Sequence, residues 1–87
     1  MELDPEEMNH VINRIKRAQG QLGGVIRMLE EGRDCEAVVT QLAAVSKALD
    51  RAGFAVVASG MQHCLANPSD DSSVDVKRME KLFLTLA

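Results

Sequence analysis

Residues 35–65 read as one unbroken helix with a cysteine near each end, and no other feature constrains the fold as strongly. A straight helix rises about 1.5 Å per residue, so Cys35 and Cys64 would lie roughly 43 Å apart. A disulfide needs Cα atoms within about 7 Å, and a fold-back would have to turn at residues 48–51, which contain neither Gly nor Pro. A second, antiparallel subunit would bring the cysteines together as two identical cross-subunit pairs. Two unrelated cysteines buried in a helical core would show the same spacing.

A first helix is predicted over about residues 5–31. Asp4 can cap it, Pro5 suits its first position, and Gly32 can end it. Its apolar residues recur on one face: Met8, Val11, Ile12, Ile15, Ala18, Leu22, Val25, Ile26 and Leu29. Glycines at 20, 23 and 24 interrupt this pattern, which indicates either the close approach of another backbone or a local loosening of the helix.

The long second helix, capped by Asp34, is apolar on two sides. One stripe has heptad spacing and consists of Val38, Leu42, Val45, Leu49, Ala52 and Val56. A second stripe consists of Val39, Ala43, Phe54, Val57 and Met61. A polar break at residues 67–71 then precedes a third, amphipathic helix over about 73–86. The pattern predicts an all-α subunit, and because one short neighbour cannot cover both apolar sides, it also predicts an oligomer.

The chain is short and acidic, with a basic segment inside it. Eighty-seven residues predict one domain, 1–87, whose core is marginal on its own. The net charge of −3 argues against nucleic-acid binding, yet residues 9–29 carry four cations and no acid. On a helical wheel, four residues of this segment share one strip: His10, Arg14, Arg17 and Gln21. Two cysteines, an acidic start and the lack of a long apolar run predict a cytoplasmic protein without a membrane span.

The segment from Asn13 to Met28 reads NRIKRAQGQLGGVIRM, and Asp34-Cys35, Gln41-Leu42 and Cys64 follow it. These residues strongly resemble the copper-sensitive operon repressor family, the CsoR-type regulators, over essentially the whole chain from Pro5. The resemblance implies an all-helical DNA-binding repressor without a helix-turn-helix. It also implies antiparallel dimers that assemble into a disc-shaped tetramer, with an inducer site built from both ends of the second helix. Double-stranded operator DNA is then the expected partner.

The resemblance also assigns residues to the two sites. It places DNA-contacting cations at Arg14 and Arg51, and Arg17 is expected to join them. Without it, ordinary solvated charges would explain these residues as well. Glu80 matches a family position that links the inducer site to the DNA face through hydrogen bonds, although it could equally be a plain surface acid.

One departure from the family pattern decides the predicted inducer. Copper-sensing members carry a histidine four residues before the second cysteine, and here that position is Gly60, so a Cu(I) site lacks its nitrogen ligand. His63 is the available substitute, but it points about 100° away from Cys64 around the helix. Two thiols without the histidine resemble the CstR branch, the CsoR-like sulfurtransferase repressors, which sense persulfides and polysulfides. The sequence therefore predicts a persulfide sensor that uses Cys35 and Cys64 and no cofactor. The alternative is a Cu(I) or other metal sensor that uses the same cysteines and His63.

Two other classes of function compete with a repressor. A small thiol transferase would need a CxxC, a cofactor loop or a base beside a thiol, and none of these is evident, so the sequence predicts no enzyme. A purely structural helical oligomer would leave the arginines and cysteines without a role.

Overall fold

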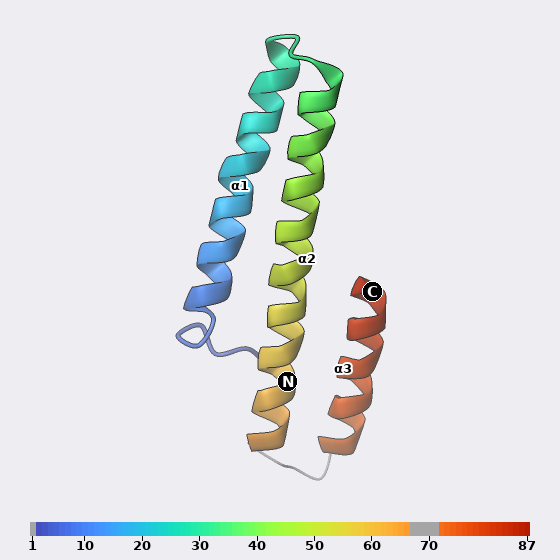
Figure 1. Cartoon of the computed structure of the whole chain (residues 1–87). Helices are drawn as coiled ribbons and strands as arrows, with labels where there is room; N and C mark the ends of the chain where they lie inside the picture. Colours follow the sequence, from blue (N-terminus) through green and yellow to red (C-terminus); the bar gives the residue numbers. More distant parts are fainter. Residues whose placement is uncertain (1, 67–71) are drawn as a thin grey trace.

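The computed structural model describes residues 2–66 and 72–87, apart from the side chains of residues 64 and 72–74. It consists of helices α1 (Asn9–Glu30), α2 (Cys35–Ala66) and α3 (Ser72–Leu86), and the described residues form no strand. The all-α prediction is therefore confirmed. Figure 1 shows α1 and α3 lying along different parts of α2, and the two outer helices make no contact with each other among the described residues. The predicted polar break at 67–71 lies outside the described residues.

The start of α1 differs from the prediction. Residues 5–8 form turns, and the helix begins only at Asn9. The Asp4 side chain accepts a hydrogen bond from the Glu6 amide at 3.0 Å, and the Asp4 carbonyl accepts one from the Met8 amide at 3.2 Å. Asp4 therefore caps this preceding turn instead of the helix itself.

The end of α1 depends on Gly32, as predicted. Its backbone has φ of +69°, a left-handed conformation that glycine adopts without a steric penalty. Its amide donates to the Leu29 carbonyl at 3.2 Å, and the Arg33 amide donates to the Met28 carbonyl at 2.9 Å. These two bonds form a Schellman motif, which satisfies carbonyls that the helix end would otherwise leave unpaired.

Helix α2 starts at the predicted cap and does not fold back. The Asp34 carboxylate accepts a hydrogen bond from the Ala37 amide at 3.3 Å. The helix then continues for 32 residues to Ala66. The unbroken course of α2 separates the positions of its two cysteines by roughly 43 Å within one chain.

The single chain is thin and buries few of its apolar side chains. Its extents are 56 × 26 × 13 Å, and its radius of gyration is 16.7 Å, whereas a compact chain of this length would have about 12 Å. The buried hydrophobic residues among those described are Met8, Val11, Ala18, Val25, Val38, Val45, Ala52, Val57 and Met79. Only part of each predicted apolar stripe is covered, because Ile26 is 53% exposed, Leu29 61% and Leu49 46%. The described residues thus leave a large apolar surface on α1 and α2 uncovered.

Two glycines of α2 let α3 pack closely against it. A Cβ atom added at Gly53 would lie 3.0 Å from the methyl groups of Leu86, and one added at Gly60 would lie 2.8 Å from the terminal methyl of Met79. From Gly53 to Gly60 the chain advances seven residues along α2, and their contacts on α3 move back seven residues, from Leu86 to Met79. This is the register of two antiparallel helices. The rings of Phe54 and Phe83 pack between these contacts, with centroids 5.2 Å apart.

None of the described helices combines the length and the apolar character that a membrane crossing would need.

The substitution Gly32→Ala should lower the free energy of unfolding by about 1 kcal/mol, because a side chain is strained at this φ. Gly20→Ala is the matched control: a Cβ there has nothing within 4 Å, and alanine favours the helix by up to about 1 kcal/mol. Urea unfolding of both variants at one protein concentration shows whether each substitution lowers or raises the free energy of unfolding. A destabilised Gly20→Ala variant would instead show that a second subunit packs against this face.

Candidate functional site

The two predicted thiol positions lie at opposite ends of α2. Cys35 is the first residue of the helix, and its side chain is exposed. Cys64 lies two residues before the helix ends, and only its backbone position is described. The single chain does not bring these residues together, so any site that uses both needs a second chain.

The three predicted arginines do come together. Arg14 and Arg17 of α1 and Arg51 of α2 line one groove of about 540 Å³, and all three side chains are exposed. The remaining lining residues are His10, Asn13, Gln21 and Ala48. No acid stands among the lining residues that the structure describes, so three cations face the groove without an opposing charge. Such a groove suits a phosphate backbone.

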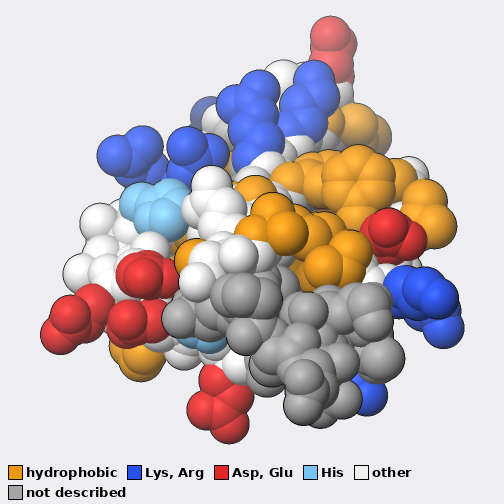
Figure 2. Space-filling model, turned by 90° about the horizontal axis from the view of Figure 1, so that it is seen from below, with side chains coloured by type: hydrophobic (Ala, Val, Ile, Leu, Met, Phe, Trp, Pro, Cys, Tyr) orange, Lys and Arg blue, Asp and Glu red, His pale blue; other side chains and the backbone are white. Residues whose placement is uncertain are grey.

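Figure 2, seen from below, shows Lys and Arg side chains gathered along one edge of the molecule and a hydrophobic patch beside them.

Asn13 also lines the arginine groove, although it was not among the predicted contacts. The sequence pattern that could have predicted it is the spacing of four residues from Asn13 to Arg17 and of four more to Gln21, which places all three on one face of α1.

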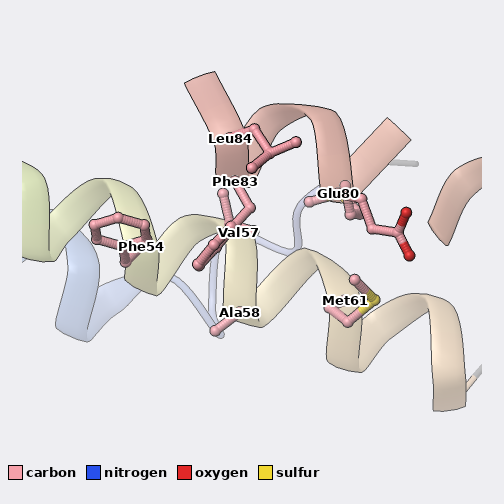
Figure 3. A pocket seen from close by; sticks show the side chains of 8 residues that line it. Phe54, Val57, Ala58, Met61, Glu80, Phe83 and Leu84 are labelled. Atoms are coloured by element: carbon pink, nitrogen blue, oxygen red, sulfur yellow. The ribbon is translucent and has the colours of Figure 1, made fainter. Parts of the chain in front are cut away.

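A second hollow, of about 660 Å³, lies between α2 and α3. The lining residues that the structure describes are apolar except for Glu80, and Figure 3 shows Phe54 at one end of the hollow and Met61 with Glu80 at the other. The Glu80 side chain is exposed, and no hydrogen bond or ion pair joins it to another described residue. The predicted link from Glu80 to the DNA face remains a prediction.

His63 and Gly60 face different neighbours. His63 lines a hollow of about 350 Å³ together with Glu7 and His10, near the start of α1. Gly60 is buried against Met79 on the α3 side. Among the described residues, no group of three or more His, Cys, Asp or Glu side chains could hold a metal ion.

The structure is thus an all-helical subunit whose arginines share one groove and whose longest helix carries a cysteine position near each end. The family model for the metal-sensitive transcriptional repressors matches residues 7–85, nearly the whole chain. This chain belongs to that family, the CsoR-type repressors, which confirms the predicted resemblance. The CstR branch is not singled out by the match.

Several curated relatives are similar to the chain over part of their length. The copper-sensing transcriptional repressor CsoR of Mycobacterium ulcerans is 40% identical over 55 residues, which are 63% of this chain and 47% of the relative. RicR of Mycobacterium tuberculosis, also a copper-sensing transcriptional repressor, is 32% identical over 69% of this chain and 62% of its own length. CsoR of Bacillus subtilis is 31% identical over 71% of this chain and 61% of its own length. The matches thus span about half to three fifths of these relatives.

Mild oxidation with diamide should never join Cys35 to Cys64 within one chain, because α2 holds their positions roughly 43 Å apart. We expect any mixed Cys35–Cys64 bridge to run at the mass of a covalent dimer on non-reducing gels. Peptide mass spectrometry of the excised bands identifies the linkage, and Cys35→Ala is the control that removes it. A Cys35–Cys64 peptide recovered from the monomer band would contradict the unbroken helix.

Proposed function

We propose that this chain is an operator-binding repressor that releases DNA when an inducer joins Cys35 of one subunit to Cys64 of another. The observation that carries the proposal is the course of α2, which holds these positions at its two ends and Arg51 between them. An inducer bound at the ends of this helix therefore acts on the same element that presents a cation to the groove.

The proposed assembly is an antiparallel dimer that pairs into a tetramer. Its support is the apolar surface of α1 and α2 that the single chain leaves exposed, Ile26 and Leu49 included. An antiparallel arrangement would cover this surface and place each Cys35 beside a Cys64. The same symmetry would multiply the arginine groove, which matters because one subunit offers only three cations there.

The proposed DNA contacts are Arg14, Arg17 and Arg51. Their support is the shared groove and the absence of an acid among its described lining residues. Arginine donates several hydrogen bonds in a fixed fork and keeps its charge at all working pH values, which suits phosphate oxygens and guanine edges. Neutralised phosphates release counterions, so the complex should weaken steeply with salt.

Cu(I) is the first candidate inducer. The family is that of metal-sensitive repressors, and the relatives compared above are named copper-sensing. These comparisons favour the copper alternative over the persulfide sensor predicted from the sequence. The donor chemistry fits, because two cysteine thiolates are soft ligands that select Cu(I). His63 is a poor third donor, since it lines the hollow near the start of α1 with Glu7.

A reactive sulfur species is the second candidate, and Gly60 is the observation that favours it. This buried position carries no side chain and packs under Met79, so it offers no imidazole to a metal. In this scheme one cysteine thiolate attacks a sulfane sulfur of a polysulfide, displaces the shortened polysulfide and becomes a persulfide. The thiolate of the other cysteine then attacks the inner sulfur, which forms the cross-subunit disulfide and expels hydrosulfide.

Arg14→Ala and Arg51→Ala should each weaken binding to a duplex from the chain's own promoter region by about tenfold or more, with a shallower dependence on salt. Arg27→Ala is the matched control, because Arg27 is an exposed cation of α1 that does not line the groove. Fluorescence anisotropy at several salt concentrations measures both effects. If all three variants bind like the parent, the DNA face lies elsewhere.

Anaerobic Cu(I) should release the DNA from the reduced protein, and Cys35→Ala should blunt the release, because it removes a soft ligand. The same assay with a polysulfide tests the second candidate. If only the polysulfide releases DNA, and a reductant restores binding, the inducer is a sulfur species. Should neither compound release DNA, a thiol-based inducer site is wrong.

A further inference from the structure

The sulfur of Met79 lies where a side chain at position 60 would stand. A Cβ atom built on Gly60 would be 2.8 Å from the Met79 terminal methyl and 3.3 Å from its sulfur. Both distances are shorter than ordinary van der Waals contact, so the thioether fills this space itself. Met79 is only 4% exposed, the one buried residue among the described side chains of α3, which keeps its sulfur away from bulk water.

The position that Met79 covers lies one helical turn before Cys64 in α2. Residues four apart on a helix lie on the same face, so backbone positions 60 and 64 share one side of α2. The Gly60–Met79 contact is part of a register that recurs two turns away, where Gly53 meets Leu86. The packing of the two helices therefore fixes the thioether beside the cysteine end of α2.

The surroundings of Met79 favour a soft, uncharged donor. The hollow that it lines has Val57, Met61 and Phe83 on its walls, and Glu80 is the one charged residue among the described lining residues. A carboxylate or a water molecule would be poorly accommodated there, whereas a thioether is neutral, flexible and polarisable. Thioethers and thiolates together form the ligand class that selects Cu(I).

We infer that Met79 is the third ligand of a Cu(I) site whose other ligands are Cys64 of the same subunit and Cys35 of a second subunit. This inference rests on the proposed function and assigns to it a donor that the sequence pattern does not reveal. Because methionine is unbranched, rotation about its Cα–Cβ and Cβ–Cγ bonds can redirect the sulfur toward an ion at Cys64. The sulfur replaces the nitrogen that Gly60 cannot supply.

The test compares Met79→Leu with the matched control Met61→Leu. Both methionines line the same hollow, and leucine conserves most of the volume while it removes the sulfur. Cu(I) affinity is measured anaerobically on the reduced protein by competition with a chromophoric chelator. We expect Met79→Leu to lose about tenfold or more in affinity and Met61→Leu to bind like the parent. X-ray absorption at the copper edge should count three sulfur ligands in the parent and two in Met79→Leu.

Gly60→Ala provides a second variant that keeps the sulfur but displaces it. The added Cβ would meet the far end of the flexible Met79 side chain, which can move without disturbing the backbone. We expect lower Cu(I) affinity here as well, with metal-free DNA binding unchanged in all three variants.

The outcomes separate this inference from the proposed function. If the parent binds Cu(I) through Cys35 and releases DNA, while Met79→Leu keeps the parent's affinity and sulfur count, the Met79 ligand alone is overturned. If the parent does not bind Cu(I), or if the Cys35→Ala variant binds Cu(I) as well as the parent does, the proposed copper function is overturned together with the Met79 ligand.

Discussion

The rigidity of α2 is the constraint on which the rest of the subunit depends. Its backbone hydrogen bonds run without interruption from Cys35 to Ala66, so the two ends cannot approach each other. Among the described residues, both other helices pack on α2 and not on each other. Helix α1 does so mainly through Val25 against Val38 and Val45, and α3 does so beside Gly53 and Gly60. The position of each candidate functional residue therefore depends on the part of α2 that carries it or packs against it. A site that needs both ends of α2 must be built from two copies of this helix.

The same long helix explains why one chain leaves much of its apolar surface exposed. A slab 13 Å thick cannot bury both apolar sides of a central helix, and side chains as large as Ile26 and Leu49 remain open to water. Covering them with a second copy would gain hydrophobic free energy at about 25 cal/mol for each Å² buried. Assembly and inducer binding would then rest on the same geometry, because the arrangement that covers the apolar faces also pairs the cysteines.

In the proposed inducer site, helix packing would change the metal chemistry. Gly60 lets α3 approach α2 closely, and this contact brings the Met79 thioether to the side of the helix that carries Cys64. A histidine at position 60 would displace the Met79 side chain and offer its own nitrogen donor instead. The family membership and the loss of the nitrogen ligand are therefore compatible, provided that the neighbouring helix supplies a sulfur atom in its place.

The sequence by itself determined the all-α class, the long helix and its cysteine-bearing ends, the Gly32 stop and the Asp34 cap, because these depend on local backbone preferences and on periodicity. It also placed Arg14 and Arg17 on one strip of α1. Only the tertiary structure decided that Arg51 joins that strip in one groove, and that Met79 lies on Gly60. Such contacts depend on the register between helices, which side-chain packing sets and no local pattern encodes. The late start of α1 at Asn9 was missed because hydrogen bonds to Asp4 stabilise a turn there as well as they would a helix.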